Sequence, residues 1–241
     1  MNFFTDNHDL KFIFDTAELD EIIGMYEDDF RDASGCAYAA RDAADARDNY
    51  RRAFEVAGDI AARIIAPLGE RIDQEHNTIK DGKVVYSAPV SECVQALRQA
   101  ELLGCTITRK YGGLNLPNFV FIMLVEIISQ ADASIQNIFG LQGISGIIEG
   151  YGDEALKEKY LPLFAEGKVT GAMALTEDEA GSDLQNVKLK AEEAPDGTWR
   201  LNGVKRFITN GGAEVLLVLA RSEQGTTDGL GLSLFLCEGD D

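Results

Sequence analysis

The residues best suited to chemistry lie in a short polar loop, TEDEAGSD, at residues 176–183. The loop follows an apolar run at 172–175 and precedes a stretch at 187–191 in which polar and apolar residues alternate. Its carboxylates could perform general acid–base catalysis, while its two hydroxyls and its glycine could hold a ligand. An Asx-rich connection or a helix N-cap has a similar composition, and the loop taken alone favours that simpler interpretation.

Two segments further along the chain strengthen the case for a ligand site. WRLNG at residues 199–203 is typical of a hairpin strand that ends in an Asn-Gly turn, and VKRFITNGG follows at 204–212. Taken alone, Phe207 is interpreted as a core aromatic residue of a strand. The three segments together favour a ligand-binding function over a plain connection.

Other common sites are not indicated by the sequence. It contains no G-x-G-x-x-G between a strand and a helix and no G-x-x-x-x-G-K-[ST]. His8 and His76 each stand in a charged segment without a second histidine at metal-ligand spacing. The four cysteines are far apart and mostly in apolar settings, which predicts buried thiols rather than a metal cluster or a disulfide framework.

The elements before residue 168 are predicted to be helical, because apolar residues recur there at three-and-four spacing. We expect a surface helix at 54–68 that ends at Pro67, and another at 90–100. The region 116–151 is apolar nearly all round, so it predicts two consecutive helices in the core of a bundle. Asp153 is expected to cap a last amphipathic helix.

After Gly167 the pattern changes to short, partly alternating runs separated by turn residues. The expected strands are 171–175, 187–191, 198–201, 204–208, 215–220 and 232–236. The predicted fold class is therefore α+β, an all-helical N-terminal domain followed by an antiparallel β domain. The expected division is an N-terminal helical extension at 1–50, a helical domain at 51–167 and a β domain at 168–241.

The net charge of the chain limits the classes of partner that it could bind. With 41 acidic and 22 basic residues among 241, the formal net charge is -19. This argues against nucleic acid, because a phosphate-tracking surface needs a local excess of cations. The loose candidates for such a patch are Lys188, Lys190, Lys205, Arg206 and the pair Arg109 and Lys110.

The N-terminus and the apolar segments predict a cytoplasmic protein that does not insert into a membrane. The first twelve residues show no apolar core followed by a cleavage site, unlike a signal peptide. The most apolar stretch, residues 119–128, is too short to span a bilayer and contains Glu126.

At residues 175–183 (LTEDEAGSD) and 202–211 (NGVKRFITNG) the sequence resembles the acyl-CoA dehydrogenase family. The middle β domain of that family carries L-T-E-P-x-A-G-S-D and, further on, N-G-x-K-x-[WFY]-I-T-N-G. KYGG at 110–113 and the segment 151–162 resemble family elements that precede this domain. The N-terminal residues 6–12 resemble the large bacterial subgroup that includes 3-methylmercaptopropionyl-CoA dehydrogenases.

The resemblance implies FAD as cofactor and assigns residues to it. In the family, backbone groups and a threonine hydroxyl at the positions of Leu175 and Thr176 bind the flavin. The positions of Gly181 and Ser182 form the turn beside the flavin and the pantetheine arm of acyl-CoA, so Ser182 is also the expected substrate-binding residue.

Two more flavin contacts are implied by the second motif. Phe207 matches an aromatic residue that packs against the flavin, and Thr209 matches a threonine whose hydroxyl approaches N5. Asp178 stands where the family usually has proline, so the turn is expected to be less preorganised here.

The implied reaction is the α,β-dehydrogenation of an acyl-CoA thioester, with α-proton abstraction and β-hydride transfer to flavin N5. The family draws the proton-abstracting Glu from a C-terminal helical domain, so we expect the catalytic Glu outside residues 1–241 and the β domain to be incomplete. We assign no catalytic residue within the chain, and the family position of Glu177 serves loop structure.

The resemblance also implies partners. They are an acyl-CoA substrate, an electron-transfer flavoprotein as acceptor, and further copies of the chain in a dimer or tetramer. Two alternatives stay open, a truncated non-catalytic remnant or subunit, and a flavin monooxygenase or nitroalkane-oxidase-like member of the same fold.

Overall fold

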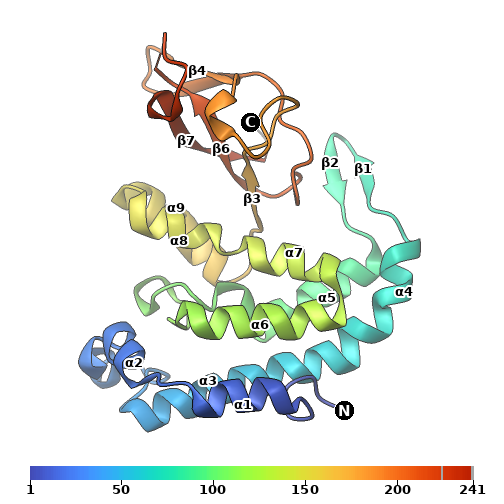
Figure 1. Ribbon diagram of the computed structural model, residues 1–241, viewed down its shortest axis with the longest axis vertical. Helices are drawn as coiled ribbons and strands as arrows, with labels where there is room; N and C mark the ends of the chain where they lie inside the picture. The colour runs from blue at the N-terminus through green and yellow to red at the C-terminus, as the bar shows by residue number, and fades with distance from the viewer. Residues whose placement is uncertain (224, 240–241) are drawn as a thin grey trace. The chain divides into compact units, whose positions relative to one another are not determined.

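A computed structural model describes residues 1–223 and 225–239, and contacts between residues divide the chain into two compact units, Met1–Lys168 and Val169–Asp241. Helices build the first unit, together with one small hairpin, and strands build the second (Figure 1). This order of a helical unit and a β unit agrees with the predicted α+β class.

The first unit contains longer helices joined by short 3-10 turns and by one π-helical turn, η2. Its elements, in chain order, are α1 (His8–Thr16), α2 (Asp20–Tyr26), η1 (Asp28–Ser34), α3 (Ala43–Ile60), η2 (Ala61–Ile65), α4 (Ala66–Gln74), β1 (Thr78–Lys80), β2 (Lys83–Val85), α5 (Ala88–Gln99), η3 (Leu102–Gly104), η4 (Arg109–Tyr111), α6 (Asn118–Ala131), α7 (Ala133–Leu141), α8 (Ile144–Tyr151) and α9 (Glu154–Ala165).

Side-chain caps fix where several of these helices begin. The carboxylate of Asp42 accepts a hydrogen bond from Asp45 N at the start of α3, and Asp132 accepts from the backbone of Ser134 and Ile135 at the start of α7. Asp153 accepts from Leu156 N at 2.8 Å, so the predicted cap of α9 is confirmed. Each cap satisfies N–H groups that the first turn leaves without an intrahelical partner.

Two helical predictions were wrong in detail. The helix expected to end at Pro67 continues, because the π-helical turn η2 shifts the hydrogen-bond register just before the proline, which lies in the first turn of α4. The region 116–151 forms three helices, α6, α7 and α8, rather than two, because Asp132 caps a new helix and Gly143 precedes another.

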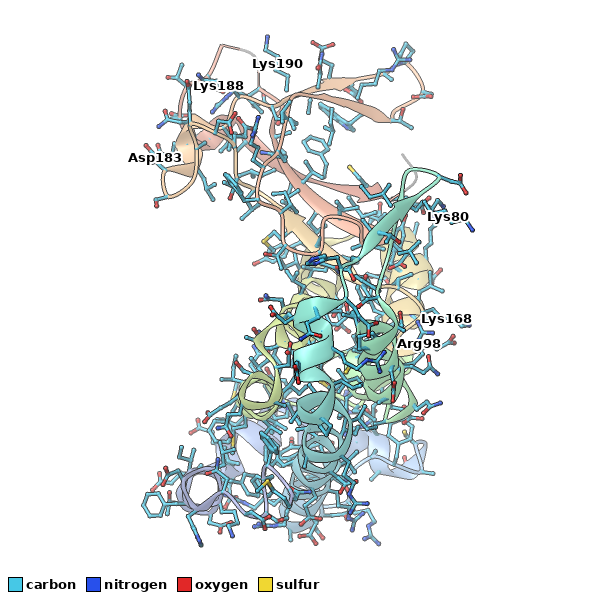
Figure 2. All side chains as sticks on the ribbon, turned by 90° about the vertical axis from the view of Figure 1, so that its right-hand side faces the viewer. Lys80, Arg98, Lys168, Asp183, Lys188 and Lys190 are labelled. Atoms are coloured by element: carbon cyan, nitrogen blue, oxygen red, sulfur yellow. The ribbon has the colours of Figure 1, made fainter. Side chains whose placement is uncertain are left out.

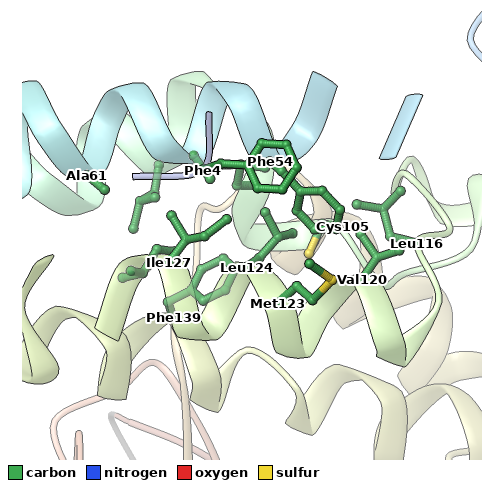
Figure 3. Close-up of a cluster of buried hydrophobic side chains, with 14 of the residues drawn as sticks. Phe4, Phe54, Ala61, Cys105, Leu116, Val120, Met123, Leu124, Ile127 and Phe139 are labelled. Carbon is green, nitrogen blue, oxygen red and sulfur yellow. The ribbon is translucent and has the colours of Figure 1, made fainter. Parts of the chain in front are cut away.

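The core of the helical unit gathers around Phe54 of α3 (Figure 3). The rings of Phe4 and Phe14 lie 5.0 and 5.2 Å from that of Phe54, measured between centroids. On the facing helices, Leu124, Ile127 and Phe139 are fully buried in the same cluster. Burial of each such side chain contributes about 1.5–3 kcal/mol, so the N-terminal segment packs as part of this unit.

The second unit holds a five-stranded sheet and two short 3-10 turns. Its elements are β3 (Gly171–Ala174), η5 (Leu184–Asn186), β4 (Lys190–Glu193), β5 (Trp199–Asn202), β6 (Val215–Arg221), η6 (Gly229–Gly231) and β7 (Leu232–Glu238). A small core of alanine, valine and leucine side chains packs on the sheet.

The sheet is mixed, so the prediction of an antiparallel β domain was wrong for part of it. β6 pairs antiparallel with β7 along its whole length, and β4 pairs antiparallel with β5. However, β6 pairs in parallel with β3 and, at Arg221, with β4. Parallel pairing requires a long connection between strands, and the chain from 175 to 214 supplies it for β3 and β6.

The expected strand at 204–208 is not formed. Phe207 and Asn210 adopt positive φ angles of 56° and 55°, which interrupt an extended conformation. The segment is a loop that connects β5 to β6.

None of the helices in the described residues combines the length and the apolar character needed to cross a bilayer.

Candidate functional site

The loop after β5 lies along β3 and its extension. Arg206 N donates to the carbonyl of Thr176 at 2.9 Å, and Asn210 Nδ2 donates to the carbonyl of Gly171 at 2.9 Å. The tertiary structure therefore brings together two of the three segments that the sequence analysis selected, 175–177 and 205–210.

A buried ion pair joins these two segments. Lys205 Nζ lies 2.9 Å from Glu177 Oε1, and the side chains are 8% and 10% exposed. The same ammonium donates to the carbonyl of Leu175 at 2.9 Å. Because both charges are removed from water, each loses hydration free energy. The ion pair and the hydrogen bond from Lys205 to the Leu175 carbonyl offset this cost.

Glu177 accepts further hydrogen bonds from the backbone that leads into β4. Lys188 N donates to Oε2 at 2.7 Å and Leu189 N donates to Oε1 at 3.0 Å. Burial on its own would raise the pKa of Glu177, but these N–H groups and the Lys205 ammonium outweigh it and hold the pKa below its usual value. A carboxylate held ionised by three donors is a structural anchor and a poor proton acceptor.

The turn between Glu177 and Ala180 is tight, with a backbone hydrogen bond in each direction between the two residues. Its other carboxylates point to surface cations. Asp178 Oδ1 lies 2.8 Å from Arg206 Nε, and Glu179 pairs with Lys188, with every one of these side chains more than half exposed. The charge that replaces the family's usual proline is thus neutralised at the surface.

Asp183, the last carboxylate of the loop, begins the next element. It accepts hydrogen bonds from Gln185 N at 3.2 Å and Asn186 Nδ2 at 2.8 Å, and so caps η5. The carboxylates of the loop are therefore engaged in ion pairs or caps, and its hydroxyls and glycine are what could face a ligand.

The sequence-predicted site residues differ in exposure. Leu175 and Thr176 are half-buried beside Lys205 and Arg206, whereas Gly181 and Ser182 are exposed beyond the tight turn. A Cβ built on Gly181 would meet nothing within 4 Å. The turn therefore leaves open space around its glycine.

Phe207 and Thr209 are both exposed on the loop that lies along β3. Phe207 is 87% exposed, so the interpretation as a core aromatic residue is wrong. Its backbone is held in the left-handed region between Arg206, which bonds to Thr176, and Asn210, which bonds to Gly171. A large apolar side chain fixed in this way is available to a planar partner.

Sequence reasoning missed several residues that position this loop. Asn210 Nδ2 also donates to Thr170 Oγ1 at 3.1 Å, and Glu214 accepts from Thr170 N at 2.7 Å. At the start of the loop, a Cβ on Gly203 would lie 2.9 Å from Leu189 Cα, so only glycine fits. Asn210 and Gly203 lie inside the second motif, which was the available signal, whereas nothing in the sequence marked Glu214.

The loose candidates for a basic patch are largely paired with carboxylates. Arg109 pairs with Glu27, Lys110 with Glu154, and Lys188 with Glu179. Figure 2 shows Lys188 and Lys190 at the periphery of the β unit, on the same side as Asp183. Within residues 1–223 and 225–239, no group of three or more His, Cys, Asp or Glu side chains could hold a metal ion.

The fold defines a class of protein in which a helical domain is followed by a β domain, and the β domain here carries a candidate ligand site built from loops. Residues 48–168 match the family described as "Acyl-CoA dehydrogenase, N-terminal domain", and residues 172–241 match "Acyl-CoA dehydrogenase, middle domain". The chain belongs to the acyl-CoA dehydrogenase family.

Curated relatives support this membership. The chain is 34% identical over 199 residues to 3-methylmercaptopropionyl-CoA dehydrogenase of Ruegeria pomeroyi, which covers 78% of this chain and 33% of that protein. It is 35% identical over 178 residues to mitochondrial isovaleryl-CoA dehydrogenase of Arabidopsis thaliana, which covers 72% and 41%. The chain thus spans less than half the length of these relatives.

Solved structures show the same fold. Butyryl-CoA dehydrogenase from Megasphaera elsdenii superposes with a TM-score of 0.68 at 28% identity, covering 78% of this chain and 48% of that one. An acyl-CoA dehydrogenase complexed with FAD from Bacillus anthracis gives a TM-score of 0.67 at 28% identity, covering 80% and 31%.

Proposed function

We propose that the chain forms the helical and middle portions of an FAD-dependent acyl-CoA dehydrogenase. The observation that carries this proposal is the loop at 205–210, which is anchored to β3 and presents Phe207 to solvent. Family membership and the FAD complex of the Bacillus anthracis relative support the cofactor.

The residues present fit a flavin. An isoalloxazine ring needs an apolar surface and polar groups at its edge, and Phe207 offers the surface while Thr176 and Thr209 carry hydroxyls on adjoining segments. Because Gly181 has open space around its Cβ position, the backbone of the turn is accessible to a ligand. Leu175, Thr176, Gly181, Ser182, Phe207 and Thr209 are therefore the proposed cofactor-binding residues, and Ser182 is also proposed to contact acyl-CoA.

The contribution of this chain to the reaction is binding and orientation. FAD, when bound, supplies the acceptor for the hydride that leaves the β-carbon of the acyl thioester. Lys205 and Glu177 hold the segments that carry Thr176 and Phe207 at fixed positions, so that little ordering is left to occur on binding.

Proton abstraction from the α-carbon is assigned to no residue of 1–241. Glu177 is held ionised by three donors, and Glu179 lies at the surface in an ion pair. A general base needs a free lone pair within reach of substrate and a pKa near the working pH. Neither carboxylate meets both conditions.

FAD binding by the chain is the direct test. Titration of the chain with FAD, followed by quenching of flavin fluorescence, is expected to show saturable binding that Phe207→Ala weakens about tenfold, equivalent to about 1.4 kcal/mol. The matched control is Leu230→Ala, since Leu230 is 89% exposed in the same unit but lies outside the proposed site. Absence of saturable binding, or an equal effect of both substitutions, contradicts the proposal.

The activity proposed for the whole protein is tested with protein that carries this chain and retains flavin. Anaerobic addition of acyl-CoA is expected to bleach the flavin absorbance, as the dehydrogenase requires. Anaerobic bleaching by a different substrate but not by acyl-CoA, with the colour restored rapidly by oxygen, would favour the monooxygenase or nitroalkane-oxidase alternative. We further propose an electron-transfer flavoprotein as acceptor, a dimer or tetramer as the assembly, and a cytoplasmic location.

A further inference from the structure

A cavity of about 210 Å³ lies within the helical unit. None of its lining residues belongs to the proposed flavin site, whose residues are all in the β unit. Liquid water occupies about 30 Å³ per molecule, so this volume equals that of about seven water molecules. Its walls include Ala53, Leu102, Leu114 and Leu116, and they also include Tyr50 and Arg109. The cavity is therefore mainly apolar with polar groups at defined points.

Two buried donors of this cavity have no hydrogen-bond partner within the described part of the chain, Tyr50 Oη and Arg109 Nε. Tyr50 is 1% exposed and the Arg109 side chain is 6% exposed. Leaving a buried donor unsatisfied costs about 1–3 kcal/mol, so each of these groups favours a ligand that carries an acceptor.

The two buried charges of the cavity are paired with each other, whereas Arg52, which also lines it, is exposed to water. Arg109 Nη2 donates to Glu27 Oε1 at 2.9 Å, and Nη1 lies 2.8 Å from Oε2, which forms an ion pair with the guanidinium but has no hydrogen-bond partner in the described part of the chain. The exposed carboxylate of Asp32 adds a weaker contact at 3.4 Å. An additional buried anion would have to be desolvated beside Glu27, which disfavours a carboxylate and favours a neutral ligand.

The Tyr50 hydroxyl remains a donor at neutral pH. Burial raises the pKa of Tyr50, and the negative charge of Glu27 raises it further, in opposition to Arg109. Tyr38 and Val56, at 49% and 44% exposure, also line the cavity and give it a route to solvent.

Part of the cavity comes from residues outside the family match. Glu27 and Tyr38 precede residue 48, where the match to the N-terminal domain begins, whereas Tyr50 and Arg109 lie within it. The N-terminal segment therefore completes a cavity that the matched region does not build alone.

We propose that this cavity binds a small neutral aliphatic compound of about seven non-hydrogen atoms, whose carbonyl oxygen accepts a hydrogen bond from Tyr50 Oη, with Arg109 Nε as the second donor. Amides, ketones and esters share this chemistry. The site differs from the proposed flavin and acyl-CoA site and does not depend on it.

The test uses pentanamide as probe and saturation-transfer NMR on the chain without FAD. We expect binding with a Kd on the order of 1 mM, as suits so small a ligand. Tyr50→Phe keeps the ring and removes the donor, so it should weaken binding at least about fivefold, or about 1 kcal/mol, for the loss of one hydrogen bond. Its urea midpoint should be equal to or above that of the wild type, because an unsatisfied hydroxyl has been removed.

A second variant tests the space rather than the donor. Ala53→Leu fills the cavity and should abolish pentanamide binding, whereas Ala44→Leu, at an exposed position of the same helix, should leave it unchanged. No saturation transfer to pentanamide in the wild type at about 10 mM, ten times the expected Kd, overturns the proposal and leaves the cavity to solvent. Equal binding by wild type and Tyr50→Phe, or tighter binding of pentanoate than of pentanamide, also overturns it.

Discussion

Removal of the Lys205 ammonium should destabilise the β unit far more than removal of its sequence neighbour, Arg206. Lys205→Met leaves the Glu177 carboxylate buried without its cation, and breaking such a pair costs about 3–5 kcal/mol when nothing else compensates. Lys188 N and Leu189 N still donate to that carboxylate. We therefore expect the free energy of unfolding to fall by about 2–3 kcal/mol, at or just below the lower end of that range.

The matched control joins the same two segments at the surface. Arg206 and Asp178 are 55% and 63% exposed, so Arg206→Met should cost less than about 1 kcal/mol. The chain has one tryptophan, Trp199, which lies in β5 beside Phe235 with 5.2 Å between ring centroids. Its fluorescence in a urea titration therefore reports unfolding of the β unit.

A double-mutant cycle completes the comparison. The coupling energy between Lys205→Met and Glu177→Gln should exceed about 1.5 kcal/mol, and that between Arg206→Met and Asp178→Asn should stay below about 0.5 kcal/mol. Equal urea midpoints for Lys205→Met and Arg206→Met, or equal coupling energies for the two pairs, would refute the reasoning that burial decides the strength of these contacts.

The remaining predictions concern the helical unit. Burial raises the pKa of Cys105 to about 12 from an ordinary value of 9.0, so the folded state is favoured while the thiol is protonated, and this stability is lost as the pH rises above 9.0 toward 12. At pH 10 the loss of stability is about 1.4 kcal/mol. Cys105→Ala should remove this loss, so its urea midpoint should fall less between pH 8 and pH 10 than that of the wild type. An equally steep fall in both proteins counts against the effect. Asp153→Ala should cost about 1 kcal/mol through loss of the cap on α9, measured by far-UV circular dichroism in urea, whereas Glu158→Ala on the exposed face of the same helix should change little. Phe54→Ala should cost about 3–5 kcal/mol, because Phe54 is fully buried between the rings of Phe4 and Phe14, and a loss below about 1 kcal/mol would contradict the packing.

Local patterns predicted the helical elements that depend on local bonding. The cap at Asp153 and the limits of α5 follow from hydrogen bonds and apolar spacing within a dozen residues, and both appear in the structure. Pro67 misled the prediction because the π-helical turn before it is a property of the packed helix rather than of any residue type.

The sequence proposed the members of the candidate site but did not predict the conformation of its second loop. The two motifs contain Thr176, Gly181, Ser182, Phe207 and Thr209, but the sequence favoured a strand at 204–208. Positive φ angles at Phe207 and Asn210, held by bonds to Thr176 and Gly171, replaced that strand with an anchored loop. The side chain that alternation would bury is exposed as a result.

The sequence by itself determined the order of a helical and a β domain, the caps and apolar faces of several helices, and the family through its motifs. Only the tertiary structure decided that β3 and β6 are parallel, that Glu177 is buried with Lys205 while Asp178 and Arg206 face water, and that Tyr50 lines a cavity. The physical reason is distance along the chain. A pattern encodes the bonding and burial of neighbours, whereas residues 28 positions apart, such as Glu177 and Lys205, meet only when the whole unit folds.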